Sequence, residues 1–359
     1  MSDLRIEKNR FATYSWLVLA YTIGVILWGA VVRATGSGNG CGDHWPLCEG
    51  QVIPHAAQIA TIIEFAHRLT SGLAVLLVVG LVYFAFRRCG KGHPARRYAV
   101  AALFFTLTEG LLGAALVLFG DVGNNASMSR VFILSLHLVN TFLLLASLAL
   151  TAKWSGERGF RQPGGRADET ADFTSLAPMA PSVSRSRGLF LAYVVALVGT
   201  LALAVTGTIA ALADTLFHAT SLAQGFEWDI SGSSSPLLRL RIIHPALAVF
   251  VGAFLIVLAV HTLIIPATPA AKRAGIVLAG LVALQICLGL LNVLLLTPVW
   301  VQLLHLLNAD LIWITLVLLA DTMLRRESSI PAKTATGPAA EPVAFAEVST
   351  SLRQTPASR

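Results

Sequence analysis

The sequence predicts an all-α integral membrane protein in which eight transmembrane helices form two tandem four-helix bundles. Of the 359 residues, 55% are hydrophobic and 13% are charged, with a mean hydropathy of +0.73, whereas a soluble domain carries about 25% charged residues. Eight apolar stretches each reach roughly 20 residues, the length that crosses a bilayer core as a helix. The last four stretches repeat motifs of the first four. Together these observations exclude a soluble globular protein.

The expected spans follow one another with short connections, except at one place. They are residues 13–33, 62–86, 99–119, 131–152, 188–210, 240–264, 273–296 and 300–323. Residues 153–187 are rich in Gly, Pro, Ser and Arg and predict a flexible cytoplasmic linker. Residues 324–359 carry no apolar period and predict a disordered tail. The expected domains are therefore an N-terminal bundle (1–152) and a C-terminal bundle (188–323).

Lysine and arginine are distributed unevenly between the two sides of the membrane. Of these 26 residues, 21 lie in the N-terminal arm, the second, fourth and sixth connections and the C-terminal tail. Cytoplasmic loops carry such an excess, so we expect both termini in the cytoplasm. The net charge of +7 is then an orientation signal, and no nucleic-acid partner is expected.

The two halves of the chain repeat one another at a nearly constant spacing. The matched residues and their offsets are Gly29 and Gly207 (178), His67 and His244 (177), Gly113 and Gly289 (176), and His137 and His305 (168). Four spans per repeat is an even number, so both copies keep the same orientation in the membrane. We expect a pseudo-two-fold axis along the membrane normal to relate them.

Four histidines lie at a similar depth, in the outer half of the spans. His67 and His137 belong to the N-terminal bundle, and His244 and His305 belong to the C-terminal bundle. Two imidazoles at one level on two helices suit axial ligation of a haem iron. A lone membrane histidine is more often a packing or proton-relay residue, and a closed zinc site needs three or four ligands in one place. The pairing by repeat and the shared depth favour two haem sites.

A carboxylate and a guanidinium accompany the first histidine. Glu64 stands one turn before His67 on the same helix face, and ionisable groups inside a membrane are functional candidates because they are costly there. We expect Glu64 to be catalytic and to transfer protons; the structural alternative is an i, i+4 ion pair with Arg68. Arg68 and Arg33 are candidate partners for haem propionates or for lipid headgroups.

These residues resemble the haem A synthase family over about residues 13–323. The resemblance rests on Glu64-Phe65-Ala66-His67-Arg68, on the His-Leu-x-Asn sequences that begin at His137 and His305, and on the loop 36–48 with its two cysteines. The chain departs from the family pattern at two positions. Pro245 follows His244 where the family usually has Arg, and Glu109 stands where Gln is expected, as at Gln285.

The resemblance implies an oxidoreductase that converts haem O to haem A for a terminal oxidase. In that family the C8 methyl group of haem O is oxidised, through a hydroxymethyl intermediate, to a formyl group. His67 and His137 would then face the substrate haem, and His244 and His305 would bind a haem b cofactor. The protein would lie in the cell membrane among lipids, with its haem sites toward the external side. It would contact a haem O synthase and an electron-transfer partner transiently, and a homo-oligomer is left open.

Cys41 and Cys48 lie close together in the first external loop. Thiols on the oxidising side of a membrane usually form disulfides, so we expect this pair to be joined, with two reduced cysteines as the alternative. The disulfide could brace the loop over a haem site or exchange electrons with a partner.

Two other classes of protein share some of these features. A di-haem electron-transfer cytochrome would also have paired histidines, but it usually stacks its haems across the membrane, whereas all four ligands here are on one side. A tandem-repeat transporter with a histidine proton relay would have Gly- or Pro-broken helices at mid-membrane, and Pro245 alone comes near that description.

Overall fold

The computed structural model describes residues 2–55, 58–156, 187–231 and 234–327, with side chains between residues 10 and 325. These residues fold into α-helices joined by loops, with one short 3-10 helix, Ser37–Asn39. Eight helices are long and apolar enough to cross a membrane. The all-α class and the eight spans are thus confirmed. Most of the predicted linker and tail lies outside the described residues.

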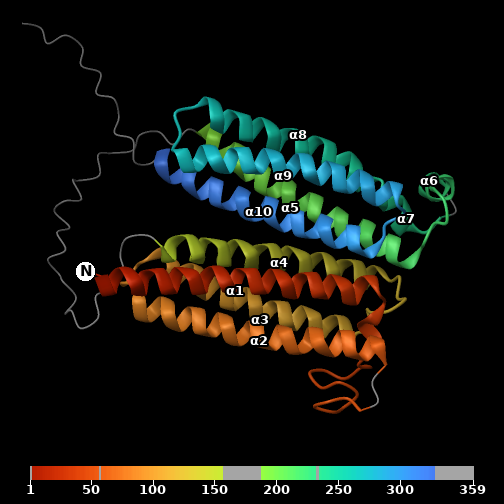
Figure 1. Cartoon of the computed structure of the whole chain (residues 1–359). Coiled ribbons are helices and arrows are strands. Elements are labelled where there is room, and N and C mark those ends of the chain that lie inside the picture. The colour runs from red at the N-terminus through yellow and green to blue at the C-terminus, as the bar shows by residue number, and fades with distance from the viewer. Residues whose placement is uncertain (1, 56–57, 157–186, 232–233, 328–359) are drawn as a thin grey trace, which may run out of the picture.

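The eight long helices form two four-helix bundles (Figure 1). The first contains α1 (Ser2–Ala34), α2 (Ile59–Arg88), α3 (Pro94–Leu118) and α4 (Met128–Ser155). The second contains α5 (Arg187–Leu216), α8 (Ile243–Ile264), α9 (Pro269–Leu294) and α10 (Val299–Glu327). In each bundle every helix contacts the next one in the chain, and the fourth contacts the first. The second and fourth helices of each bundle therefore stand at opposite corners.

The helix ends follow local sequence signals. Ser127 caps α4 by accepting a hydrogen bond from the backbone N–H of Arg130 (3.2 Å), and Thr268 caps α9 in the same way. Such caps satisfy backbone donors that the first helical turn leaves free. α4 ends at Ser155 and α10 at Glu327, so both helices run slightly beyond the ends expected at 152 and 323.

The sixth expected span, 240–264, lies within one apolar stretch, Pro236–Ile264, that could cross a membrane, and this stretch has one irregularity near its start. The structure divides it at Ile242 into a short helix, α7 (Pro236–Arg241), and α8. Pro245 lacks the N–H that would bond to the carbonyl of Arg241, so a continuous helix would lose a hydrogen bond there. The break lies two residues before His244.

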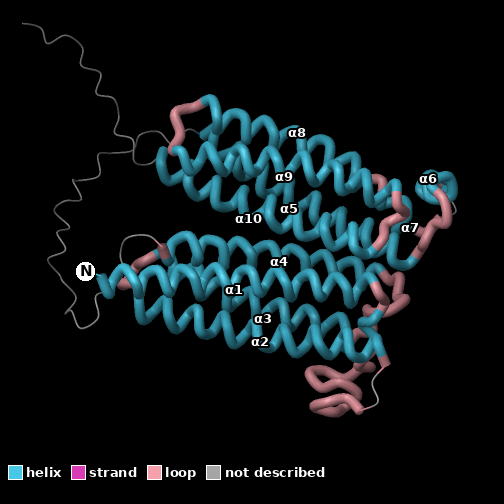
Figure 2. Tube along the Cα trace, in the orientation of Figure 1, coloured by secondary structure: helices cyan, strands magenta, loops and turns pink. Residues whose placement is uncertain are grey.

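A further short helix, α6 (Leu222–Ile230), lies between α5 and α7 and was not predicted. Ser221 accepts a hydrogen bond from the backbone N–H of Gln224 (3.2 Å). Ser-x-x-Gln is a known helix-start signal, so the sequence did contain evidence for this helix. Figure 2 shows α6 and the loop before α2 at the same end of the molecule, opposite the start of α1.

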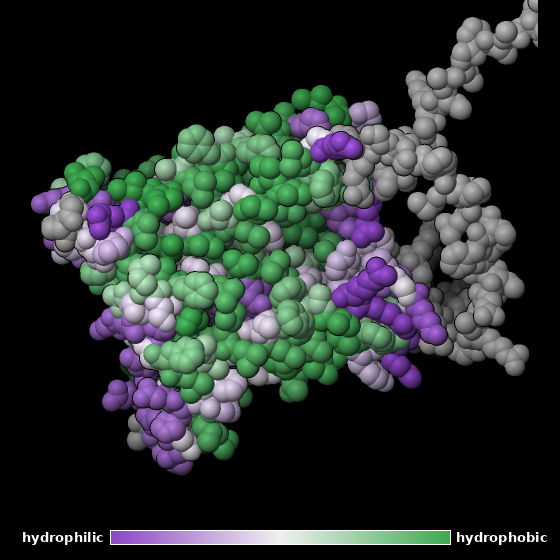
Figure 3. Space-filling model, turned by 180° about the vertical axis from the view of Figure 1, so that it is seen from behind, coloured by the Kyte–Doolittle hydropathy of each residue, from purple (hydrophilic) through white to green (hydrophobic). Residues whose placement is uncertain are grey.

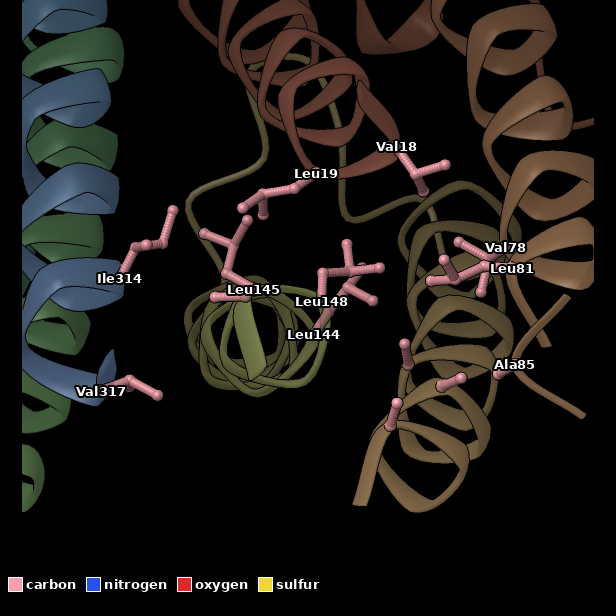
Figure 4. Packing of buried hydrophobic residues seen from close by; sticks show 14 of the residues in the cluster. Val18, Leu19, Val78, Leu81, Ala85, Leu144, Leu145, Leu148, Ile314 and Val317 are labelled. Carbon is pink, nitrogen blue, oxygen red and sulfur yellow. The ribbon is translucent and has the colours of Figure 1, made fainter. Parts of the chain in front are cut away.

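The two bundles pack along α4 and α10, the two spans that are most buried within the protein. Ile314 and Val317 of α10 join the core of the first bundle around Leu145 (Figure 4). Beside them, Trp313 donates a hydrogen bond to the backbone carbonyl of Phe142 (2.6 Å), and the ring centroids lie 5.2 Å apart. This packing fixes how the two bundles face each other.

The outer surface of the helices suits a lipid environment. Hydrophobic residues cover the sides of the bundles, and polar residues gather at both ends (Figure 3). Large apolar side chains such as Leu76, Phe104, Phe250 and Ile276 are exposed on these sides. Because water would oppose so much apolar exposure, the protein is a multi-pass membrane protein.

Candidate functional site

Each of the four histidines packs against a glycine of the preceding helix in its bundle. A methyl group at Gly29 would lie 3.0 Å from Cε1 of His67, and one at Gly207 would lie 2.9 Å from Cε1 of His244. A methyl group at Gly289 would lie 3.3 Å from Cε1 of His305, and one at Gly113 would lie 4.0 Å from Cε1 of His137. The glycines that mark the internal repeat thus give the imidazoles the space they occupy.

The histidines of each bundle come from opposite corners. His67 is on α2 and His137 is on α4, while His244 is on α8 and His305 is on α10. Both pairs therefore project toward the bundle interior from two sides. His67 and His137 lie close enough to interact electrostatically.

The rings of His244 and His305 have centroids 6.3 Å apart and planes inclined at 73°. Two imidazole nitrogens that bind one metal from opposite sides, each at about 2 Å, place the ring centres roughly 6 Å apart. The separation in the second bundle is therefore that of two axial ligands.

His244 is also oriented by its surroundings. Its Nδ1 lies 3.1 Å from the backbone carbonyl of Leu203 and 3.2 Å from Oγ1 of Thr206. A metal-binding histidine commonly donates its second N–H to a carbonyl, which fixes the tautomer and leaves the other nitrogen for the metal. This arrangement leaves Nε2 of His244 available as a ligand.

Three imidazole nitrogens have no polar partner in the described part of the chain. Nδ1 is buried and unbonded in His67, His137 and His305. In the first bundle, Oε1 of Glu109 lies 3.4 Å from Nε2 of His137. The first pair of histidines thus differs from the second in its nearest polar neighbour.

Glu109 is held in place by side chains of α4. Asn140 donates to its Oε2 (2.5 Å) and Thr141 donates to its Oε1. In the second bundle, Asn308 donates to Oε1 of Gln285 (2.6 Å), and Gln285 donates to the backbone carbonyl of His305 (3.2 Å). The two bundles therefore share a hydrogen-bonded pair between their third and fourth helices.

Glu64 is 3% exposed, and both of its oxygens are engaged. Oε1 forms an ion pair with Arg68 (2.5 Å), and Oε2 accepts a hydrogen bond from the backbone N–H of Cys41 (2.8 Å). Arg68 also donates to the backbone carbonyls of His44 and Leu47, each at 2.6 Å. Together Glu64 and Arg68 attach the loop between α1 and α2 to α2.

The same loop is closed by a disulfide between Cys41 and Cys48. Both cysteines are buried, and the backbone N–H of Cys48 also donates to the carbonyl of Gln51 (3.0 Å). The expected pairing is present. The loop is consequently attached to α2 and braced internally.

The second bundle has a different ion-pair network at the corresponding place. Arg241 stands where Glu64 stands in the first repeat, at an offset of 177. It pairs with Asp214 of α5 (2.7 Å) and Asp229 of α6 (2.6 Å). In the second bundle, the charged contacts thus join α7, which precedes the helix that carries His244, to α5 and α6.

Arg33 joins the two bundles. Its guanidinium donates to the backbone carbonyl of Ala211 (2.7 Å), to Oγ1 of Thr215 (2.7 Å) and to Oε1 of Gln302 (3.0 Å). At the other end of the interface, Lys153 pairs with Asp321 (2.8 Å). These contacts connect the bundles at both membrane surfaces.

The residues present fit haem, the group that the resemblance implies. The second pair has the ring separation of two axial ligands, and the contact of Nδ1 of His244 with the carbonyl of Leu203 leaves its Nε2 for iron. The described residues contain no group of three or more His, Cys, Asp or Glu side chains arranged around a metal ion. His67, His137, His244 and His305 are therefore the residues that would hold two haem groups, one in each bundle.

Fold and site together define the class: a multi-pass membrane protein with two histidine pairs suited to haem. Residues 12–317 match the model of a family described as COX15-CtaA, cytochrome oxidase assembly protein. The chain belongs to this family, and the resemblance to haem A synthases is confirmed at that level.

Curated relatives agree with this family but extend beyond the chain. A protein of Thermus thermophilus named Protoheme IX farnesyltransferase is 43% identical over 319 residues, which cover 89% of this chain and 49% of the relative. A Heme A synthase of Alkalihalophilus pseudofirmus is 34% identical over 187 residues (52% and 55%). One of Halalkalibacterium halodurans is 41% identical over 125 residues (35% and 41%). The chain spans about half the length of the curated relatives it matches.

Proposed function

We propose that this chain is a haem A synthase that oxidises the C8 methyl group of haem O, through a hydroxymethyl intermediate, to the formyl group of haem A for a terminal oxidase. The observation that carries the proposal is the four-fold histidine–glycine packing, repeated in both bundles. Two relatives named Heme A synthase support the choice of reaction.

The two bundles have different tasks in this proposal. His67 and His137 hold the iron of the substrate haem, and His244 and His305 hold the iron of haem b. When bound, haem b supplies electron transfer to and from the substrate site. The carbonyl of Leu203 keeps the proton on Nδ1 of His244, so that Nε2 serves as the ligand.

Glu64 is the proposed proton-transfer residue of the first bundle. Oxidation of a methyl group to a formyl group removes protons repeatedly at one carbon, and a nearby carboxylate can accept them. Both oxygens of Glu64 are engaged by Arg68 and Cys41, so proton transfer requires one of these bonds to open. Arg68 and Arg33 are likewise bonded to protein groups, and binding a propionate would require an exchange of those partners.

The proposed topology places both termini in the cytoplasm and the disulfide loop with the histidines toward the outside. The excess of Lys and Arg in the loops at the other end supports this orientation. Haem O would reach the first bundle from a haem O synthase, and the farnesyltransferase relative supports a transient contact with such an enzyme. The second proposed protein partner is an electron-transfer protein.

The test is to extract and separate the haems of purified protein from cells with and without a co-expressed haem O synthase. The proposal expects haem b in both preparations, and haem O and haem A only when the synthase is present. Haem b alone in both preparations would instead indicate an electron-transfer cytochrome.

A further inference from the structure

The short helix α6 carries an apolar face that the described part of the protein leaves uncovered. Leu222, Phe226 and Ile230 are spaced four residues apart, so they lie on one side of the helix. Their side chains are 48%, 66% and 63% exposed. Gln224 and Trp228, on the opposite side, are half-buried. An apolar stripe of this kind is costly in water and marks a surface that contacts an apolar partner.

The other faces of α6 are attached to the protein. Asp229 pairs with Arg241 of α7 (2.6 Å), and Arg241 also donates to the backbone carbonyl of Gly225 (3.2 Å). Trp228 packs against the buried cluster that contains Leu212. A helix of nine residues is only marginally stable by itself in water, so these contacts hold α6 together and fix the direction in which its apolar face points.

The axis of α6 runs across the long helices. Figures 1 and 2 show α6 nearly end-on, whereas the long helices lie lengthwise in the same view. Because the long helices cross the membrane, α6 runs along the membrane surface.

The lipid-facing surface of the second bundle extends to the place where α6 is attached. Ile242 and Ile243, which directly follow α7, are 42% and 46% exposed, and Trp300 in the first turn of α10 is 55% exposed. Tryptophan is enriched where acyl chains meet headgroups. Since α6 contacts α7, its apolar face continues this surface.

We infer that α6 is an interfacial helix whose apolar face enters the lipid bilayer at the end of the protein nearest the four histidines. The three apolar side chains then contact acyl chains, while Glu227, which is exposed on the neighbouring side, stays in contact with water. Helices with one apolar and one polar face lie in this boundary with the apolar side about 5–10 Å deep. The ion pair of Asp229 with Arg241 connects this anchor to α7, which precedes the helix of His244.

The test measures where α6 lies in phosphatidylcholine vesicles. Full-length protein carrying Cys287→Ser receives one new cysteine by Phe226→Cys or, as the matched control, by Glu227→Cys, and each is labelled with a nitroxide; the remaining free cysteine, Cys89, is buried. Oxygen concentrates among acyl chains and a nickel chelate stays in water, so electron paramagnetic resonance with each reagent, present on both sides of the bilayer, distinguishes the two surroundings. The ratio of oxygen to nickel collisions should be severalfold higher at position 226 than at position 227.

Leu222→Cys and Ile230→Cys repeat the measurement on the same face, in case Phe226→Cys does not fold, and should give the same high ratio. Ratios as low as that of Glu227→Cys would place the face in water and overturn the inference. Low collision rates with both reagents would place the face against protein and would overturn it as well. In that case, spin–spin broadening that disappears on dilution with unlabelled protein would identify a second copy of the chain as the partner.

Discussion

The two bundles are built from one repeat, but the surroundings of their histidines differ. In the second bundle, His244 is oriented by a backbone carbonyl, and its ring lies 6.3 Å from that of His305. In the first bundle, Nδ1 is unbonded on both histidines, and an oxygen of Glu109 lies 3.4 Å from Nε2 of His137. The repeat thus supplies a common scaffold, and a few polar side chains give the two histidine pairs different surroundings.

The largest effect should come from removing one ligand of the second pair. His244→Ala or His305→Ala should abolish the low-spin haem b spectrum, because loss of an axial ligand removes one of two bonds to iron. His67→Ala should leave that spectrum in place. Absorption spectra of the purified variants measure both effects. A haem b spectrum that disappears in His67→Ala but survives in His244→Ala would reverse the assignment of the two bundles.

The next effect concerns Glu64. Glu64→Gln should lower haem A by at least about tenfold, the low end of a general-base effect, while the haem b of the second bundle is kept. Haem O or its hydroxymethyl derivative should accumulate, as measured by chromatography of extracted haems. The second bundle provides the comparison, because Arg241 stands at the equivalent position. Near-normal haem A at equal protein level would leave Glu64 with its loop-holding contacts alone.

A graded effect is expected from alanine at the glycines. Gly207→Ala places a methyl group 2.9 Å from His244, closer than side-chain packing allows, and Gly113→Ala places one 4.0 Å from His137, an ordinary contact. Haem b content should fall severalfold in Gly207→Ala, whereas Gly113→Ala should bind the haem of the first bundle as the wild type does. Gly280→Ala, which meets no atom within 4 Å, is a control in the same bundle as Gly207. Equal haem loss in all three variants would show that the imidazole contacts do not matter.

The cysteines should give the smallest effect. Cys41 and Cys48 should react with a thiol reagent only after reduction, and replacing both with alanine should cost about 2 kcal/mol of stability, since the closed loop is short.

Burial raises the pKa of the Cys89 thiol to about 11. Because the thiolate is the reactive form, Cys89 should label slowly near neutral pH and faster as the pH approaches 11. Mass spectrometry after timed labelling measures the reactivity of Cys41, Cys48 and Cys89. Free Cys41 in rapidly quenched cells would contradict the disulfide.

Hydropathy and the internal repeat predicted the eight spans and the four histidines. Apolar length alone identifies a membrane helix, and two copies of a motif confirm each other. Sequence could not show that Gly29 and Gly207 face the imidazoles, because the rotation of each helix depends on packing with its neighbours. The contact between Glu109 and His137 was missed for the same reason, although the mismatch with Gln285 had marked the position.

The connection between the bundles was also beyond the sequence. Arg33 was expected near a propionate, but its guanidinium bonds to α5 and α10. These partners lie far along the chain, and no local pattern indicates them. The break at Ile242 did have a local signal in Pro245, which fits the first turn of α8 and not the interior of a continuous helix.

The central claim is that the first bundle holds the haem that is converted, which must exchange, whereas the second bundle retains its haem. The most direct test loads His67→Ala and His244→Ala proteins with haem and measures the rate at which each loses haem to apomyoglobin. His244→Ala, which retains the first site, should lose haem at least about tenfold faster than His67→Ala, which retains the second. Equal rates, or faster loss from the second site, would contradict the account.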